Sequence, residues 1–198
     1  GGLETPDSGQ ILYDDTEAAD PGHASCGPSR RMAFVFQEPR LMPWLTVEGN
    51  IGFGLSRKEK KDSREHIRKI ILAAGLEGFE KAYPAQLPGG MKQRTALARA
   101  LAFRPSFIMM DEPFAALDYF TREQMQQELL RVQEAEHCSI LFVTHSIDEA
   151  LLLADQIVIL KQGTVKALYP VTAPKQDRNL LDPEFISLKK NLLRDLNL

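Results

Sequence analysis

The sequence predicts an α/β fold in which a mostly parallel sheet is flanked by helices. Strand-like segments alternate with segments whose apolar residues recur at helical spacing, and this alternation is typical of parallel strands joined by helices. Three strand-like segments are continuously apolar, as expected of strands buried on both faces of a parallel sheet: 33–36, 107–110 and 140–143. With 198 residues, of which 43% are hydrophobic, the chain is long enough to bury a sizeable core.

Five strands and several helices are expected in order. The strands are rich in β-branched and apolar residues and cover 10–13, 32–37, 106–111, 139–144 and 156–160. The helix over 64–74 carries three isoleucines at helical spacing, and the helix over 91–103 is rich in alanine. Because residues 52–103 contain no good strand, we interpret them as a helical insertion.

The later helices are predicted from shorter patterns. A helix over 119–137 has an expected inner face made of Phe120, Met125, Leu129 and Val132. The residues from Ser146 to Glu149 form a capping-box pattern that opens a helix over 147–154. The tail over 170–198 contains several prolines and ends in a short amphipathic helix from about Pro183.

Composition restricts the function classes. A net charge of −3 gives the whole chain no attraction for nucleic acid, and no basic stripe marks a nucleic-acid partner. Cys26 and Cys138 lie far apart without metal-like spacing, which favours a reducing compartment. No apolar run reaches the roughly 20 residues that a membrane-spanning helix requires, and the first residues are not a signal peptide.

Two adjacent carboxylates, Asp111 and Glu112, stand at the end of the apolar strand over 106–111. Placing them there costs free energy unless they face a cleft or a cation, and in open α/β sheets ligands bind beyond the carboxyl ends of the strands. Asp111 is therefore a candidate Mg²⁺ ligand, and Glu112 is a candidate base for an attacking water. The alternative is that they cap the next helical turn.

Gln37 and His145 follow two of the other apolar strands. Taken singly, Gln37 is typical of a loop and His145 of a structural histidine. If the three strands are parallel, however, amide, carboxylate and imidazole groups meet at one edge of the sheet. That convergence favours a shared site over separate structural roles.

Two further motifs complete a resemblance. These are Leu87-Pro88-Gly89-Gly90-Met91-Lys92-Gln93-Arg94 and Ala116-Leu117-Asp118. With Gln37, Asp111-Glu112-Pro113 and His145, they resemble in order and spacing the nucleotide-binding subunit of an ABC transporter, from Gly2 to at least Gly163. A narrower similarity, to the ATPases of nitrate, sulfonate and taurine importers, is carried by residues 36–47 and by Asp177-Arg178 and Asp182-Pro183-Glu184-Phe185 in the tail.

The resemblance implies a P-loop NTPase-type core with a helical subdomain, used as a dimer that sandwiches two ATP molecules. It divides the chain into four parts. Residues 1–51 are the remainder of the N-terminal β region with the Q-loop, and residues 52–103 are a helical subdomain with the signature motif. Residues 104–169 are an α/β core with Walker B, D-loop and H-loop, and residues 170–198 are a C-terminal tail with a short helix. The family's N-terminal strands and P-loop helix precede the position matched by Gly1, so we expect them to be absent.

The resemblance also implies catalytic roles by position. Glu112 is the expected general base, His145 is expected to hold the γ-phosphate of ATP, and Asp111 is expected to bind Mg²⁺. Gln37 is expected to contact both Mg²⁺ and the attacking water.

A second group of residues is expected to act across the dimer. The resemblance implies that the signature residues bind the ATP held by the opposite subunit: Pro88, Gly89, Gly90 and Gln93. Backbone N–H groups at the start of a helix favour an anion, which suits this role. Asp118 is expected at the dimer interface.

The implied partners are a transmembrane permease subunit, a second copy of the ATPase and, indirectly, a substrate-binding protein. The implied location is the cytoplasmic face of the plasma membrane, and the implied reaction is ATP hydrolysis coupled to uptake of a small anion. Arg40 and Trp44 lie in the loop that the family uses to meet the permease, so they are candidate permease contacts. For Trp44 the alternative is burial in the core.

Two departures from the family pattern bear on activity. Pro88 stands where the family usually has serine, and a lost hydrogen bond to a charged group costs about 1.5–3 kcal/mol, which weakens ATP contact across the dimer. The P-loop pattern G-x-x-x-x-G-K-[ST] requires a Gly-Lys dipeptide, and the sequence has none. The alternative function is therefore a catalytically degenerate interaction module that keeps the permease-facing surface. An ABC protein of DNA repair or translation fits less well, because no long coiled-coil insertion is present.

We expect the 198-residue chain to bind ATP poorly and to hydrolyse it negligibly, because the lysine and amides that cradle the phosphates are missing. Titration with a non-hydrolysable ATP analogue, with and without Mg²⁺, measures this. Micromolar binding that depends on Mg²⁺ would contradict the expectation and would argue against the interaction-module alternative.

Overall fold

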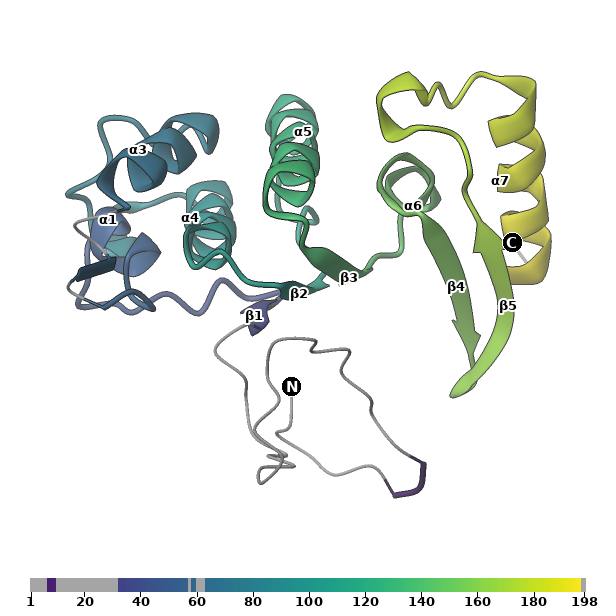
Figure 1. The fold of residues 1–198 in the computed structure, drawn as a ribbon, viewed down its shortest axis with the longest axis horizontal. Helices are drawn as coiled ribbons and strands as arrows, with labels where there is room; N and C mark the ends of the chain where they lie inside the picture. Colours follow the sequence, from purple (N-terminus) through teal and green to yellow (C-terminus); the bar gives the residue numbers. More distant parts are fainter. Residues whose placement is uncertain (1–6, 10–31, 57, 60–62, 197–198) are drawn as a thin grey trace.

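A three-stranded parallel sheet is the framework of the protein (Figure 1). The computed structural model describes residues 7–9, 32–56, 58–59 and 63–196. Strands β1 (Met32–Val35), β2 (Phe107–Asp111) and β3 (Ser139–Val143) lie in the order β1-β2-β3, and both pairs are parallel. The predicted α/β class and the parallel pairing are therefore confirmed. The expected strand over 10–13 and Cys26 lie outside the described residues.

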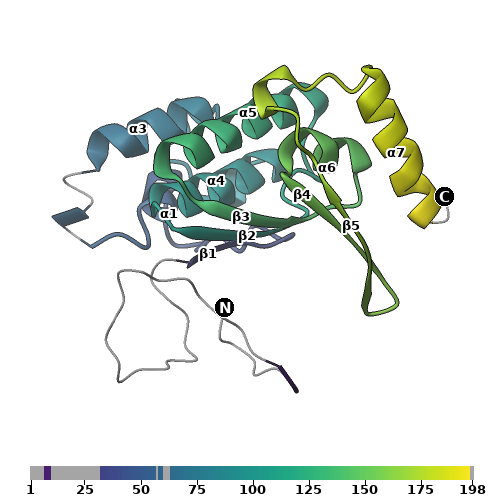
Figure 2. The ribbon, with the colours of Figure 1, turned by 45° about the vertical axis from the view of Figure 1, so that its right-hand side comes forward.

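The two faces of this sheet differ in burial. Figures 1 and 2 show the helices on one side of β1, β2 and β3. The side chains on that face are buried or partly buried in one apolar core: Ala33, Val35, Ile108, Met110, Ile140 and Phe142. On the other face Leu141 is 55% exposed and Val143 is 57% exposed. The prediction that residues 140–143 are buried on both faces is wrong, because the helices of the described part pack on one face only.

Helix α4 (Gly89–Ala102) lies at the centre of the helical layer. It packs against β1, α1 (Val47–Ile51) and α3 (Arg64–Ala73), and a short 3₁₀ helix (Pro84–Gln86) precedes it. Its alanines and leucines are almost fully buried, since small side chains let neighbouring elements approach closely: Ala96, Leu97, Ala98, Ala100, Leu101 and Ala102. The helices over 52–103 share one continuous core with the sheet.

Helix α5 (Tyr119–Glu136) buries a different face from the predicted one. Met125 and Leu129 are buried as expected, but Phe120 is 75% exposed and Thr121 is buried instead. The reason is spacing: residues four apart lie on one helix face, so Thr121 aligns with Met125 and Leu129, whereas Phe120 does not. The side chain of Val132 lies outside the described part of the structure.

The C-terminal elements form a second core beside the first. Helix α6 (Ile147–Leu153) is followed by an antiparallel hairpin of β4 (Gln156–Lys161) and β5 (Thr164–Pro170). A 3₁₀ helix, η2 (Lys175–Asp177), leads to α7 (Pro183–Leu196), which packs against α6 and β4. The sequence analysis missed β5. Its signal is the two-residue turn Gln162-Gly163, where both φ angles are positive, at 51° and 77°. No helix in the described ranges is long and apolar enough to cross a membrane.

Arg178 fastens the tail to the C-terminal end of α6. Its Nη1 donates to the backbone carbonyls of Leu151, Leu152 and Ala154 at 2.8–3.1 Å. Its Nε and Nη2 donate to the carbonyls of Ala173 and Val171. The bonds from Nη1 satisfy carbonyl groups that the C-terminal end of α6 leaves unpaired. At the other end of α6, Lys189 of α7 lies 2.5 Å from Asp148. Both ends of the helix that follows His145 are thus held by the tail.

We expect Arg178→Ala to lower the free energy of unfolding by about 1.5–3 kcal/mol, because hydrogen bonds from a charged donor to buried carbonyls are lost. Urea denaturation of the 198-residue chain measures the loss. Arg131→Ala is the matched control, since Arg131 is exposed and its ion pair is with its helix neighbour Glu128; it should change stability by no more than about 0.5 kcal/mol. Equal effects of the two substitutions would contradict the capping role.

Candidate functional site

The strand register brings Gln37, Glu112 and His145 to one edge of the sheet. Val35 pairs with Met110, so Gln37 stands opposite Glu112 two residues beyond the last pair of the ladder. Asp111 pairs with Val143, so His145 lies one residue past the position opposite Glu112. Parallel strands place their carboxyl ends at the same edge, and the predicted convergence is present.

The Glu112 carboxylate joins the other two side chains. Gln37 donates from Nε2 to Oε2 of Glu112 at 3.3 Å. The Nδ1 atom of His145 lies 3.2 Å from Oε1 of the same carboxylate. Glu112 is about one-quarter exposed, whereas the His145 side chain is 75% exposed. One carboxylate therefore holds an amide and an imidazole, and the three groups face a common space at the sheet edge.

The backbone at Glu112 is held in an uncommon conformation. Its φ is 44°, in the left-handed region that residues with a side chain seldom adopt. Its N–H donates to the carbonyl of Val143 at 2.9 Å, which extends the contact between β2 and β3 by one residue. Residues with a side chain keep this conformation only where the surrounding contacts hold them in it, and such residues cluster at functional sites. The turn at Glu112 is what directs its carboxylate toward Gln37 and His145.

The oxygen groups at this edge match the chemistry that Mg²⁺ prefers. Asp111 is the exposed last residue of β2, and the Gln37 amide uses its nitrogen on Glu112, so its Oε1 is left for another partner. Mg²⁺ is usually held by one or two protein oxygens together with waters and substrate phosphates. Among the described residues no group of three or more His, Cys, Asp or Glu side chains is arranged to hold a metal by itself. The donors fit a metal that arrives with phosphates.

Helix α4 begins at the segment Pro88-Gly89-Gly90, in which Pro88 and Gly89 are exposed and Gly90 is half-buried. Pro88 is the N-cap residue, and no side chain caps the helix there. A Cβ built on Gly89 would meet nothing within 4 Å, whereas one on Gly90 would lie 3.7 Å from the Ala116 carbonyl. The first amides of this helix have no partner within the helix. Their position leaves them open to an anion, and it places them beside the segment that leads to Asp118.

Gln93, the fourth expected signature residue, is a buried residue of α4. Its side chain is only 2% exposed. Its Nε2 donates to the carbonyls of Phe36 at 3.4 Å and Pro113 at 3.3 Å, both within the same chain. Gln93 thus ties the residue before Gln37 to the residue after Glu112. The nucleotide contact expected of Gln93 stays a prediction.

Asp118 caps helix α5 and contacts α4. Its carboxylate accepts from the Thr121 N–H at 3.1 Å and lies 3.7 Å from Nη2 of Arg94. Hydrogen bonding from Thr121, with a smaller contribution from Arg94, holds the pKa of Asp118 below its usual range. The carboxylate is 66% exposed. Asp118 is thus ionised and open to solvent, and it directly follows Leu117, whose side chain lies close to Gly90.

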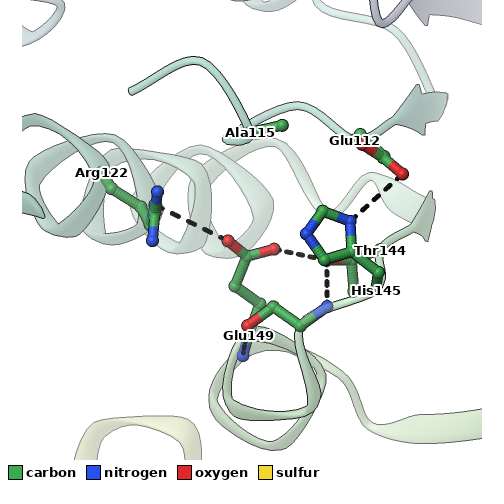
Figure 3. Close-up of a pocket in the computed structure, with 7 residues that line it drawn as sticks. Glu112, Ala115, Arg122, Thr144, His145 and Glu149 are labelled. Atoms are coloured by element: carbon green, nitrogen blue, oxygen red, sulfur yellow. Dashed lines mark hydrogen bonds and ion pairs between the residues drawn. The ribbon is translucent and has the colours of Figure 1, made fainter. Parts of the chain in front are cut away.

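A pocket of about 280 Å³ opens beside Glu112 and His145. Figure 3 shows three further side chains that face it: Arg122, Thr144 and Glu149. None of the three was predicted from the sequence to be a site residue, although the capping-box pattern from Ser146 to Glu149 marks the segment that contains Glu149. Half of the expected capping box forms, because Ser146 Oγ accepts from the Glu149 N–H at 3.3 Å. The Glu149 carboxylate instead accepts from the Thr144 hydroxyl at 2.6 Å, so the reciprocal half is replaced.

The loop that carries Trp44 is organised by a buried asparagine. Asn50 is fully buried; its Oδ1 accepts from the Met42 N–H, and its Nδ2 donates to the carbonyls of Met42, Leu45 and Thr46. Trp44 at the tip of this loop is 68% exposed, so the core alternative for this residue is excluded. The sequence analysis missed Asn50, because a lone asparagine carries no pattern.

Arg40 lies between the site and this loop. Its guanidinium carbon sits 4.2 Å from the centre of the Phe36 ring, and its φ is 42°. Arg99 of α4 donates to the carbonyls of Arg40 at 2.9 Å and Pro39 at 3.1 Å. Burial lowers the pKa of Arg99, but a guanidinium remains charged. The segment after Gln37 is therefore held from α4.

Comparison with known proteins gives one consistent result. Residues 1–115 match the ABC transporter family. An uncharacterized ABC transporter ATP-binding protein of Methanocaldococcus jannaschii is 43% identical over 98% of this chain and 72% of its own length. The aliphatic sulfonates import ATP-binding protein SsuB of Bacillus cereus is 40% identical over 98% of this chain and 74% of its own length.

Solved structures agree with these sequence relatives. A dimeric post-hydrolysis state of the ATP-binding cassette MJ0796, bound to ADP and Pi, matches with a TM-score of 0.63 and 34% identity. The match covers 72% of this chain and 64% of that one. CbiO1 of Clostridium perfringens, part of the ABC transporter complex cbiONQ, matches 99% of this chain and 74% of its own with a TM-score of 0.71. At 24% identity that likeness supports the fold alone.

We expect Gln93→Glu to be far more destabilising than Gln93→Met. The glutamate buries a negative charge against two carbonyl oxygens, which costs about 3–5 kcal/mol, whereas methionine removes two hydrogen bonds at a cost of about 1–2 kcal/mol. Urea denaturation of the 198-residue chain compares them. If Gln93→Glu is as stable as the parent, the internal contacts to Phe36 and Pro113 are wrong.

Proposed function

Because this chain belongs to the ABC transporter family of ATP-binding proteins, we propose that it is an ATP-hydrolysing subunit of an importer for a small anion of the sulfonate type. The observation that carries the proposal is the Glu112 carboxylate, which contacts both Gln37 and His145 at the edge of the sheet. The sulfonate class comes from relatives named for aliphatic sulfonates import, which are about 40% identical to this chain. The whole assembly acts on the cytoplasmic face of the membrane.

The site is suited to attack of water on the γ-phosphate. Phosphoryl transfer needs an oriented nucleophile and charge stabilisation more than covalent help from the protein. Glu112 acts as the general base, since each of its oxygens keeps a lone pair beyond the contacts with Gln37 and His145. His145 holds the γ-phosphate, and its exposed ring leaves the other nitrogen open to that contact. Gln37 orients the attacking water.

Magnesium accompanies the nucleotide in this proposal. Bound Mg²⁺ would supply charge neutralisation to the phosphates. Asp111 and the Oε1 of Gln37 would hold it from the protein side, and phosphates and waters would complete its shell. Gln37 would therefore lie between the metal and the base.

The amides of Gly89 and Gly90 bind the γ-phosphate of ATP held by a second copy of the chain. The start of α4 has no side-chain cap and Gly89 is exposed there, and these features together with the partial positive charge of a helix N-terminus support this assignment. Pro88 supplies neither a hydroxyl nor an N–H, so the contact is weaker than one made with serine. The ionised, exposed Asp118 lies beside Gly90 at the same surface and faces the second copy.

The surface around Trp44 receives the permease. Trp44 is exposed at the tip of a loop that Asn50 holds rigidly, as suits an aromatic anchor for a partner. A groove of about 990 Å³ opens nearby between α1 and α3, lined among others by Thr46, Gly49, Ile67 and Ile71. Arg40 joins this surface to the site, since it follows Gln37 by three residues and its backbone is bonded to α4. A module that binds the permease without hydrolysing ATP would use the same surface.

The test places a P-loop-bearing segment from a sulfonate importer relative before these residues and measures Mg-ATP turnover. We expect Glu112→Gln to lower kcat by about 10²–10⁴-fold, the usual contribution of a general base, while nucleotide binding persists. Glu123→Gln on the exposed side of α5 is the matched control and should leave kcat unchanged. Turnover that is indifferent to Glu112→Gln refutes the assigned base.

A further inference from the structure

We infer that Glu149 is a positioning residue for His145, acting through Thr144, and that Arg122 links this carboxylate to the segment ending at Leu117. The inference rests on the proposed function, because it concerns the side chain assigned to the γ-phosphate. None of the three residues was among the predicted site residues. All three line the pocket beside Glu112 (Figure 3).

The His145 ring does not hold its own place by packing. Its side chain is 75% exposed, and its contact with Glu112 is one atom pair at 3.2 Å. The backbone on either side sets the position and direction of the His145 Cα–Cβ bond, and the contact with Glu112 selects the rotamer of the ring. What fixes the backbone from Thr144 to Ser146 therefore decides whether the imidazole can meet Glu112.

The residues on both sides of His145 are tied to Glu149. The Thr144 hydroxyl donates to Oε2 of Glu149 at 2.6 Å, and its oxygen accepts from the Ser146 N–H at 3.1 Å. Ser146 in turn accepts from the Glu149 N–H at 3.3 Å. The Thr144 hydroxyl has one proton to donate, and it donates that proton in the bond to Glu149. Its oxygen is then left to accept from the Ser146 N–H, so the direction of both hydrogen bonds is fixed. This closed loop of bonds encloses the backbone of His145.

Arg122 compensates the buried carboxylate and connects it to another segment. The Glu149 side chain is only 9% exposed, and its Oε1 lies 3.8 Å from Nε of Arg122. The Nη2 of Arg122 donates to the Leu117 carbonyl at 2.9 Å, one residue before Asp118. A buried carboxylate is stable only with such a partner. A movement of the Leu117-Asp118 segment therefore reaches Thr144 and His145 through two side chains.

Imidazole ¹⁵N NMR of the histidine-labelled 198-residue chain tests the inference. His145→Asn identifies the His145 signals among the four histidines, and Glu112→Gln measures the displacement that follows loss of the carboxylate neighbour. We expect Thr144→Val, which keeps the shape but removes the hydroxyl, to displace the His145 signals in the same direction and by a comparable amount. Thr144→Ser, which keeps the hydroxyl, should leave them at the parent position.

Glu149→Gln gives a second, independent measurement. It keeps an acceptor for the Thr144 hydroxyl but removes the charge opposite Arg122, so we expect a smaller displacement of the same signals. If Thr144→Val does not fold, Thr144→Ala takes its place with the same expected displacement. Unchanged His145 signals in the folded Thr144 variant and in Glu149→Gln overturn the inference.

The readout separates this inference from the proposed function, because it requires neither nucleotide nor turnover. Displaced His145 signals support the positioning role even if Glu112→Gln leaves turnover unchanged. Unchanged signals remove the positioning role while the base assignment to Glu112 stands. Loss of stability alone, measured by urea denaturation, displaces no signal in the folded state and so does not imitate the expected result.

Discussion

The parallel alignment of β1, β2 and β3 is the constraint on which the site depends. Each strand ends in one turn of irregular backbone, and the shared direction of the strands brings the three turns to one edge of the sheet. Glu112 turns sharply there, with a φ of 44°, and its carboxylate meets both Gln37 and His145. A one-residue slip between β2 and either neighbour would move Glu112 away from one of its partners, since side chains alternate between the two faces of a strand. The position of these three side chains is therefore a consequence of strand register.

Helix α4 connects this edge to the surface proposed for the second copy. It is buried on nearly all sides, so its polar side chains must find partners inside the protein. Gln93 reaches Phe36 and Pro113, and Arg99 reaches Pro39 and Arg40. Arg94 contacts Asp118 and the Thr121 hydroxyl. A helix whose first residues are open to an anion is thus bonded to the segments that carry Gln37, Glu112 and Asp118.

Helix α6 is held in a comparable way from the opposite side. The Glu149 carboxylate fixes the turn before the helix, and Arg178 satisfies the carbonyls at its end. The tail therefore contributes to the geometry of His145 without touching it. Both helices that border the site are restrained through backbone carbonyls, which tolerate little displacement because hydrogen bonds weaken steeply with distance and angle.

The sequence by itself determined the α/β class, the three parallel strands, most of the helices and the convergence of Gln37, Asp111-Glu112 and His145, because these follow from local periodicity and from residues next to strand ends. Tertiary structure alone decided which faces are buried, as Leu141, Val143 and Phe120 show. It also decided the partners of buried and half-buried polar side chains. Gln93 and Arg122 carry no pattern that predicts contacts with Phe36, Pro113 or Glu149 tens of residues away, and Asn50 carries none that predicts its bonds to the loop before it. A strand or helix is specified by its neighbours in the chain, whereas a buried polar contact is specified by whichever segment packing brings within about 3 Å.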